Sequence, residues 1–190
     1  MHSLKKQLEC NFGLIPLPES HGLRPRVNVG KGRRPVGAPE GKKRIAILGV
    51  GSELRGDDAA GMLVAKNIEK HLKGKPQNNI GIFLGETAPE NLTGEIKKFK
   101  PTHLLIIDSA EIGKKAGEVQ LFSPEEIKGI SFCTHQLPMK IMFSYLKKFI
   151  DCDFAIIGIQ PKYLTFDSKP SKEVVAAVKY ISKTIIETIM

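Results

Sequence analysis

Cysteine is scarce in this 190-residue chain, and its spacing excludes the structures that depend on it. The three cysteines, Cys10, Cys133 and Cys152, are odd in number, lie far apart and form no C-x-x-C pair. Neither a disulfide framework nor a cysteine zinc site fits this pattern, so we expect reduced thiols. The sequence also lacks a G-x-S-x-G motif, which removes the nucleophile elbow of the serine hydrolases.

Long apolar runs are absent as well. Runs such as Leu104–Ile107 and Phe154–Ile157 fall far short of the roughly twenty residues that a membrane-spanning helix needs. The N-terminal residues do not contain the apolar stretch of a cleavable signal peptide. We therefore expect a cytoplasmic protein without membrane insertion.

Positive charge is plentiful, but most of it lies in the first part of the chain. Residues up to Arg44 include ten Lys and Arg side chains and three acidic ones, while the whole chain has a net charge of +9. This leading segment, Met1 to about Gly41, is rich in Pro, Gly and Arg and shows no sustained periodicity. We expect it to be an extension, extended or loosely docked, ahead of a domain over 42–190. Because no aromatic-rich basic strand accompanies the charge, a nucleic-acid partner is not expected.

From Lys43 onward, apolar runs alternate with amphipathic segments. Strands are expected at 44–51, 79–85, 102–110 and 153–161, with a short edge strand at 117–122. Helices are expected at 58–72, 89–99, 135–149 and 171–189, the last with Ser171 as its N-cap. Continuous Ile and Leu runs between helices predict an α/β fold with three α/β/α layers: a mostly parallel twisted sheet with helices on both faces. The hydrophobic content of 41% is sufficient for one such domain.

The loop sequence "LGVGSELRGDDAAG" begins like a phosphate-binding turn and ends like a carboxylate site. Gly49 and Gly51 follow a predicted strand, as in a dinucleotide-binding fingerprint. Leu54, however, stands where that fingerprint needs its third glycine. The two adjacent acids, Asp57 and Asp58, would also repel a pyrophosphate. The pattern therefore argues against a nucleotide-binding module.

Three polar positions are expected at the carboxyl ends of the predicted strands. Asp57 and Asp58 follow the first strand, Asp108 closes the third, and His135 precedes a helix. Because ligands of open α/β sheets gather at this end of the strands, we expect Asp58, Asp108 and His135 to converge on one cleft. They suit an open metal site or acid–base chemistry. The structural alternatives are a helix cap for Asp57, a turn for Asp108 and a surface position for His135.

Several motifs together resemble one enzyme family. "GVGSELRGDDAAG", "TAPEN", "LLIIDSAEIGKKAGEV", "THQLP" and "IIGIQP" occur in the order and at the intervals seen in the hydrogenase maturation endopeptidases. The resemblance extends from about Arg44 to the C-terminus. It implies a peptidase that removes the C-terminal peptide of a [NiFe] hydrogenase large-subunit precursor once nickel has been inserted. "TAPEN" and "GIQP" look most like the branch serving membrane-associated, hydrogen-evolving hydrogenases.

The resemblance also implies roles for particular residues. Asp58, Asp108 and His135 would contact nickel and carry catalysis, while the glycines let the chain turn so that these side chains face one another. The substrate-binding residues would be Gly51, Ser52, Thr87 and Glu90. Two positions depart from the family pattern: Ser52 stands where Asn is usual, and Ala59 where Gly is usual.

The metal in this interpretation belongs to the substrate. We expect no permanently bound cofactor, although other divalent ions can occupy the same ligands. The expected partner is the hydrogenase large-subunit precursor, and the protein is expected to be a monomer. A nickel-binding maturation chaperone without peptidase activity is the alternative, because the same ligands would serve it.

Overall fold

The structure is a computed structural model that describes residues 3–11, 43–75, 78–123, 126, 131–132 and 136–190. The strands are β1 (Ile45–Val50), β2 (Ile80–Glu86), β3 (His103–Glu111), β4 (Val119–Phe122), β5 (Ser131–Phe132) and β6 (Asp153–Ile159). The α-helices are α1 (Leu4–Asn11), α2 (Ala60–Leu72), α3 (Thr93–Phe99), α4 (Gln136–Phe149) and α5 (Lys172–Ile189). Two 3-10 helices are η1 (Gly56–Ala59) and η2 (Pro89–Leu92). None of the described helices is both long and apolar enough to cross a membrane.

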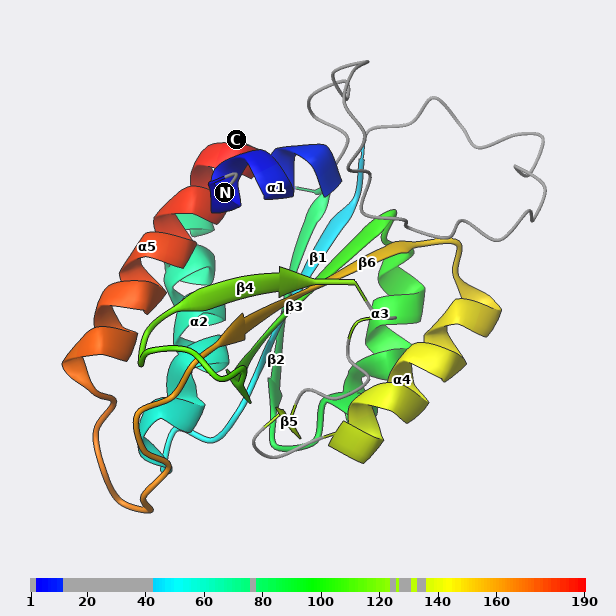
Figure 1. The fold of residues 1–190 in the computed structure, drawn as a ribbon. Coiled ribbons are helices and arrows are strands. Elements are labelled where there is room, and N and C mark those ends of the chain that lie inside the picture. The colour runs from blue at the N-terminus through cyan, green and yellow to red at the C-terminus, as the bar shows by residue number, and fades with distance from the viewer. Residues whose placement is uncertain (1–2, 12–42, 76–77, 124–125, 127–130, 133–135) are drawn as a thin grey trace, which may run out of the picture.

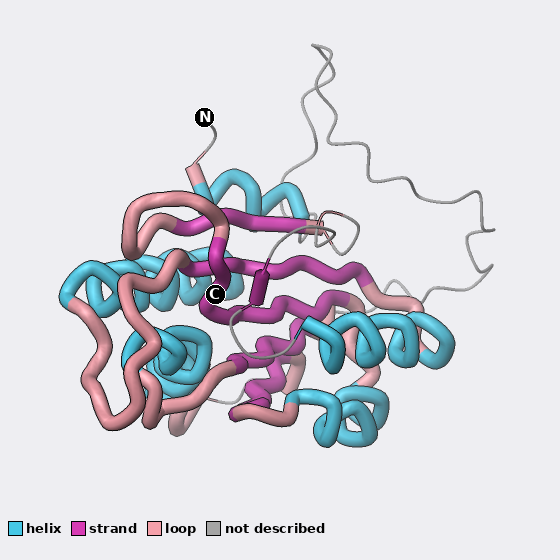
Figure 2. Tube along the Cα trace, turned by 60° about the horizontal axis from the view of Figure 1, so that its bottom comes forward, coloured by secondary structure: helices cyan, strands magenta, loops and turns pink. Residues whose placement is uncertain are grey.

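The sheet is mostly parallel and has the strand order β2-β1-β3-β6-β4. Strands β2, β1, β3 and β6 run parallel to one another, while the edge strand β4 is antiparallel to β6. The short β5 pairs antiparallel with the end of β3. Figure 2 shows the strands between two groups of helices. The predicted three-layer α/β/α fold is thereby confirmed.

Alternate side chains of the central strands enter two separate cores. Leu105 and Ile107 of β3 belong to the core that α1, α2 and α5 cover, whereas Leu104 and Ile106 belong to the core under α3 and α4. Figure 1 shows these two sets of helices on opposite sides of the sheet. Because successive strand side chains point to opposite faces, a continuous apolar run needs helices on both.

The described strands and helices follow the predicted ones closely, with one difference that affects the site. The prediction that Asp108 closes its strand is wrong. Asp108 lies within β3, three residues before the strand ends at Glu111. The strand ends at Glu111, one residue beyond the predicted end, because β6 pairs with it as far as Ser109 and β5 pairs with Ala110 and Glu111. Asp108 still lies one residue beyond Ile107, where the pairing between β1 and β3 ends.

Helix α1 was not predicted, and it belongs to the core. Leu8 is fully buried and Leu4 nearly so, both in the core that contains α5. The most extensive contacts of α1 are with α5 and β4. Part of the predicted extension over 1–41 is therefore packed on the domain, while residues 12–42 lie outside the described residues.

The burial of Leu8 leads to a prediction about stability. Leu8→Ala should lower the free energy of unfolding by about 3 kcal/mol, because it removes buried methyl groups and leaves a cavity between α1 and α5. Urea denaturation of the full chain measures the change. Lys6→Ala, at an exposed position of the same helix, is the control and should change stability by less than about 0.5 kcal/mol. Equal stability of the Leu8→Ala and wild-type proteins would show that α1 contributes nothing to the core.

Candidate functional site

The loop after β1 folds back over the end of its own strand. Gly51 has a φ angle of 122°, and a Cβ atom there would overlap the backbone carbonyl oxygen of Asp58. Only glycine fits such a position without strain. Gly49 serves a different purpose from the predicted turn: it lies in β1, where a Cβ would be 2.5 Å from the carbonyl oxygen of Gly61 in α2. One glycine allows the turn, and the other allows close packing of strand and helix.

Asp58 is fully buried at the end of β1 and is held by groups on both sides. Its Oδ2 accepts a hydrogen bond of 2.9 Å from the backbone N–H of Ser52. Its Oδ1 accepts a bond of 3.0 Å from the Ser109 hydroxyl, on β3. Because Ser109 is next to Asp108 in sequence, this bond ties the first carboxylate to the strand that carries the second.

Asp108 is also fully buried, but its environment differs from that of Asp58. Neither of its carboxyl oxygens has a hydrogen-bond partner among the described residues. Burial raises the pKa of Asp108 well above its ordinary value, and the nearby Asp58 raises it further; the backbone N–H of Ser109 is near the carboxyl group but makes no hydrogen bond of good geometry with it, so it opposes the rise only in part. A buried carboxyl group without partners is costly, which makes Asp108 the foremost candidate for a ligand of this site.

Asp57 has a structural role, although not the predicted one. The helix cap that was one alternative for it is absent, because neither η1 nor α2 has a side-chain cap. Its buried Oδ2 accepts bonds from the backbone N–H groups of Lys162 (2.7 Å) and Tyr163 (3.2 Å). Oδ1 accepts from the Ser171 N–H at 2.6 Å, and Oδ2 accepts from the Ser171 hydroxyl at 2.9 Å. Asp57 therefore holds the loop between β6 and α5, and the predicted cap Ser171 accepts in turn from Val174 N–H.

A cleft of about 340 Å³ lies beside Asp58. Three of the four predicted substrate-binding residues line it: Gly51, Ser52 and Thr87. The fourth, Glu90, is not among the lining residues but lies in η2, and its Oε2 is buried without a hydrogen-bond partner in the described part of the chain. The other lining residues are Glu53, Leu54, Met62 and Glu86.

His135 lies outside the described residues, so its predicted place beside the two carboxylates remains a prediction. Chain on both sides of it is described: Phe132 pairs with Ala110, two residues after Asp108, and α4 begins at Gln136. Within the described ranges, no three His, Cys, Asp or Glu side chains are grouped closely enough to hold a metal ion. Of the predicted ligands, the structure brings together Asp58 and Asp108.

Sequence reasoning missed two contributors to this site. Ser109 is buried and orients Asp58, and Met62 lines the cleft while its sulfur accepts a bond from the Glu86 N–H. The position of Ser109, directly after a candidate ligand, was a signal that could have found it. Met62 gave no polar signal, because it matches the apolar periodicity of α2.

The fold and the carboxylate site can be compared with those of known proteins, and the comparison identifies the class of protein. Residues 62–188 match the family model described as hydrogenase maturation protease. The hydrogenase 3 maturation protease of Escherichia coli is 32% identical over 136 residues, which cover 70% of this chain and 84% of that protein. A candidate hydrogenase maturation protease of Methanocaldococcus jannaschii is 40% identical over 151 residues, 77% of this chain and 89% of its own length.

A solved structure supports the same conclusion. The crystal structure of a [NiFe] hydrogenase maturation protease from Thermococcus kodakarensis superposes with a TM-score of 0.70 at 33% identity, covering 79% of this chain and 94% of that one. The chain belongs to the hydrogenase maturation protease family and is a peptidase. The resemblance identified from the sequence motifs is confirmed.

The hydrogen bonds of Asp57 predict a large effect of a nearly isosteric change. Asp57→Asn should lower the free energy of unfolding by about 3 kcal/mol, because an amide NH₂ would face N–H or O–H donors that now meet a carboxylate oxygen. Chemical denaturation measures the loss. The control is Asp151→Asn, at an exposed position before β6, which should have little effect. A stable Asp57→Asn protein would show that the loop between β6 and α5 is held by other contacts.

The raised pKa of Asp108 predicts a pH-dependent gain for its own amide variant. The folded state holds this proton more tightly than the unfolded chain, so the contribution of Asp108 to stability is fully present below the ordinary value of 3.8 and is lost as pH rises through the raised pKa. Asp108→Asn removes that loss, because the amide does not ionise. Its free energy of unfolding should therefore exceed that of the wild type at neutral pH, and the gap should narrow toward acidic pH. Urea titrations at several pH values test this, and a gap that does not change with pH would contradict it.

Proposed function

We propose that this peptidase removes the C-terminal peptide of a [NiFe] hydrogenase large-subunit precursor after nickel insertion. Asp58, Asp108 and His135 contact the nickel that the precursor carries. The observation that carries the proposal is the fully buried Asp108 carboxyl group, without a hydrogen-bond partner among the described residues and close enough to Asp58 for their charges to interact.

Two neighbouring buried carboxyl groups are suited to a divalent cation. Burial, and to a smaller extent the nearby Asp58, disfavour ionisation of Asp108. A divalent ion reverses this balance, because its charge stabilises the ionised form of Asp108 and displaces its proton. The bonds from Ser52 and Ser109 fix the Asp58 carboxylate before the metal arrives, so less order must be gained on binding.

The precursor, rather than this protein, supplies the metal in this proposal. Carboxylates are hard ligands that hold nickel less firmly than a full set of nitrogen or sulfur donors, and a single imidazole adds one nitrogen. Such a set recognises a metal that is already bound elsewhere and needs no resident cofactor. Nickel placed near the peptide bond would orient the substrate and polarise the carbonyl group or a water molecule.

The substrate chain would lie in the cleft beside Asp58. Gly51, Ser52 and Thr87 line it and would bind the precursor segment that is cut. Glu90, in the adjacent η2, is proposed to contact the substrate from outside the cleft lining. The hydrogen-evolving branch, a cytoplasmic location and a monomeric state are part of the same proposal. The branch is supported by the "TAPEN" and "GIQP" motifs and by similarity to a protease named for hydrogenase 3.

Mass spectrometry of the precursor tests this function directly. A nickel-loaded large-subunit precursor incubated with the protein should lose a C-terminal peptide, and nickel-free precursor should stay intact. His135→Ala should reduce the cleavage rate by about a hundredfold, the upper end of the range seen when a metal site loses a supporting group. The matched control is His71→Ala, an exposed histidine of α2, which should cut at the wild-type rate.

The outcomes separate the peptidase from its alternative. Binding of nickel-loaded precursor with no shortened product would favour the non-proteolytic chaperone. Cleavage of nickel-free precursor at an equal rate would exclude nickel recognition. Normal cleavage by His135→Ala would remove that residue from the ligand set and leave Asp58 and Asp108 to act without it.

A further inference from the structure

Leu54 is an exposed apolar side chain inside the candidate cleft. It leaves 60% of its surface to solvent, whereas Gly56 to Asp58, two to four residues later, are buried. A single exposed leucine on a protein surface is ordinary. This one lines the same cleft as Gly51, Ser52 and Thr87, beside the buried Asp58. The position of Leu54 in the candidate cleft, rather than its exposure alone, makes it a candidate for substrate binding.

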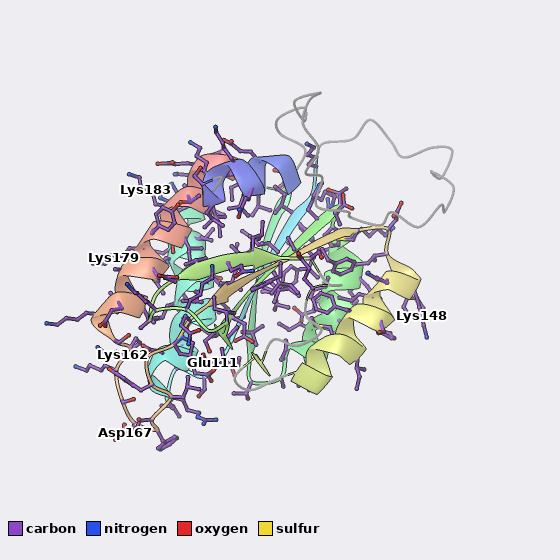
Figure 3. The ribbon with its side chains drawn as sticks, in the orientation of Figure 1. Glu111, Lys148, Lys162, Asp167, Lys179 and Lys183 are labelled. Carbon is purple, nitrogen blue, oxygen red and sulfur yellow. The ribbon has the colours of Figure 1, made fainter. Side chains whose placement is uncertain are left out.

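A second exposed apolar residue lies on the segment hydrogen-bonded to Leu54. The Asp167 N–H donates to the Leu54 carbonyl oxygen at 2.7 Å, and Phe166, the residue before it, is 69% exposed. Arg55 forms a β-bridge with Ser168, so the two segments run side by side. Figure 3 shows Asp167 at the far end of this loop, below Lys162 and the start of α5. We call Leu54 and Phe166 the apolar lip.

The backbone under the apolar lip is held firmly. Asp57 accepts bonds from the Lys162, Tyr163 and Ser171 N–H groups of the loop. The Gly56 N–H donates to the Ser168 carbonyl oxygen at 3.1 Å, which links the loop again to the turn that carries Leu54. Exposure of the lip is thus a property of an ordered surface, and an ordered surface loses little conformational entropy when a partner binds.

We propose that the apolar lip binds an apolar side chain of the precursor segment next to the bond that is cut. This inference rests on the proposed function and adds a specificity determinant to it. The cleft volume of about 340 Å³ is near the lower limit of ligand pockets, roughly 300 to 1,000 Å³, and suits a short peptide segment better than a dinucleotide. An apolar contact is favoured on the Leu54 side, because desolvating that surface costs nothing in lost hydrogen bonds.

Steady-state cleavage kinetics of Leu54→Ser and Phe166→Ser test the apolar lip. The substrate is the nickel-loaded large-subunit precursor, and the products are followed by mass spectrometry. Leu54→Ser should raise KM about tenfold with little change in kcat. The substitution removes an apolar contact that stabilises the bound substrate and the transition state equally, so binding weakens while the chemical step is unchanged. Leu54→Met, which keeps the apolar surface, should restore KM to near the wild-type value. Tyr180→Ser is the control, since Tyr180 is 50% exposed on α5.

A change in the substrate gives a second, independent readout. Apolar precursor residues within two positions of the cut bond are replaced one at a time by serine. At the position that meets the lip, this replacement should raise KM for the wild-type protein but add little for Leu54→Ser, since the contact is already lost. The proposal would be overturned if every serine replacement in the precursor raised KM by the same factor for the wild-type protein and for Leu54→Ser.

The failures of the two proposals are distinguishable. A wild-type protein that leaves the precursor uncut contradicts the proposed function. A wild-type protein that cuts it, together with unchanged KM in both lip variants, contradicts only the apolar lip. Loss of activity in Leu54→Ser that parallels a lower melting temperature would assign Leu54 to the fold and also overturn the proposal.

Discussion

The end of the sheet that carries the site depends on the donors that surround the Asp57 carboxylate. Burying this group is tolerable only because backbone N–H groups and a hydroxyl from the distant loop converge on it. The loop between β6 and α5 must therefore close over the turn after β1. That closure positions the Ser171 cap of α5 and places Phe166 next to the segment of Leu54.

Asp57 and Asp108 show that the same type of buried side chain serves opposite purposes in this protein. Asp57 meets donors throughout and stabilises the fold, whereas Asp108 is buried beside another acid with no partner in the described part of the chain. A carboxyl group in this state opposes folding at neutral pH. Its presence is understandable if a cation completes the site, because the cation then supplies the stabilisation that the protein itself withholds.

Most of the fold could be predicted because local patterns determine it, and the differences come from contacts across long separations. The runs at Leu104–Ile107 and in β6 indicated strands buried on both faces without reference to any other segment. The predicted end of β3 falls one residue short of Glu111, because that last residue pairs with the short β5, which the sequence did not indicate. The role of Asp57 depends on Lys162, 105 residues away. Helix α1 has only two buried leucines to mark it, too few to give a clear period.

The glycine-rich loop explains why a dinucleotide-like sequence forms a carboxylate site. A phosphate would occupy the space where the chain leaves β1 and the next helix begins, with backbone N–H groups directed at it. Here the Ser52 N–H in that space donates to Asp58 instead. The backbone of Gly51 packs against the Asp58 carbonyl group, and Gly49 packs against α2. In this arrangement the Asp58 carboxylate is directed at β3, where it accepts a bond from Ser109. The Ser52 N–H, which in a phosphate-binding loop would be directed at the anion, is already taken by the protein's own acid, so this loop is not arranged to hold a phosphate.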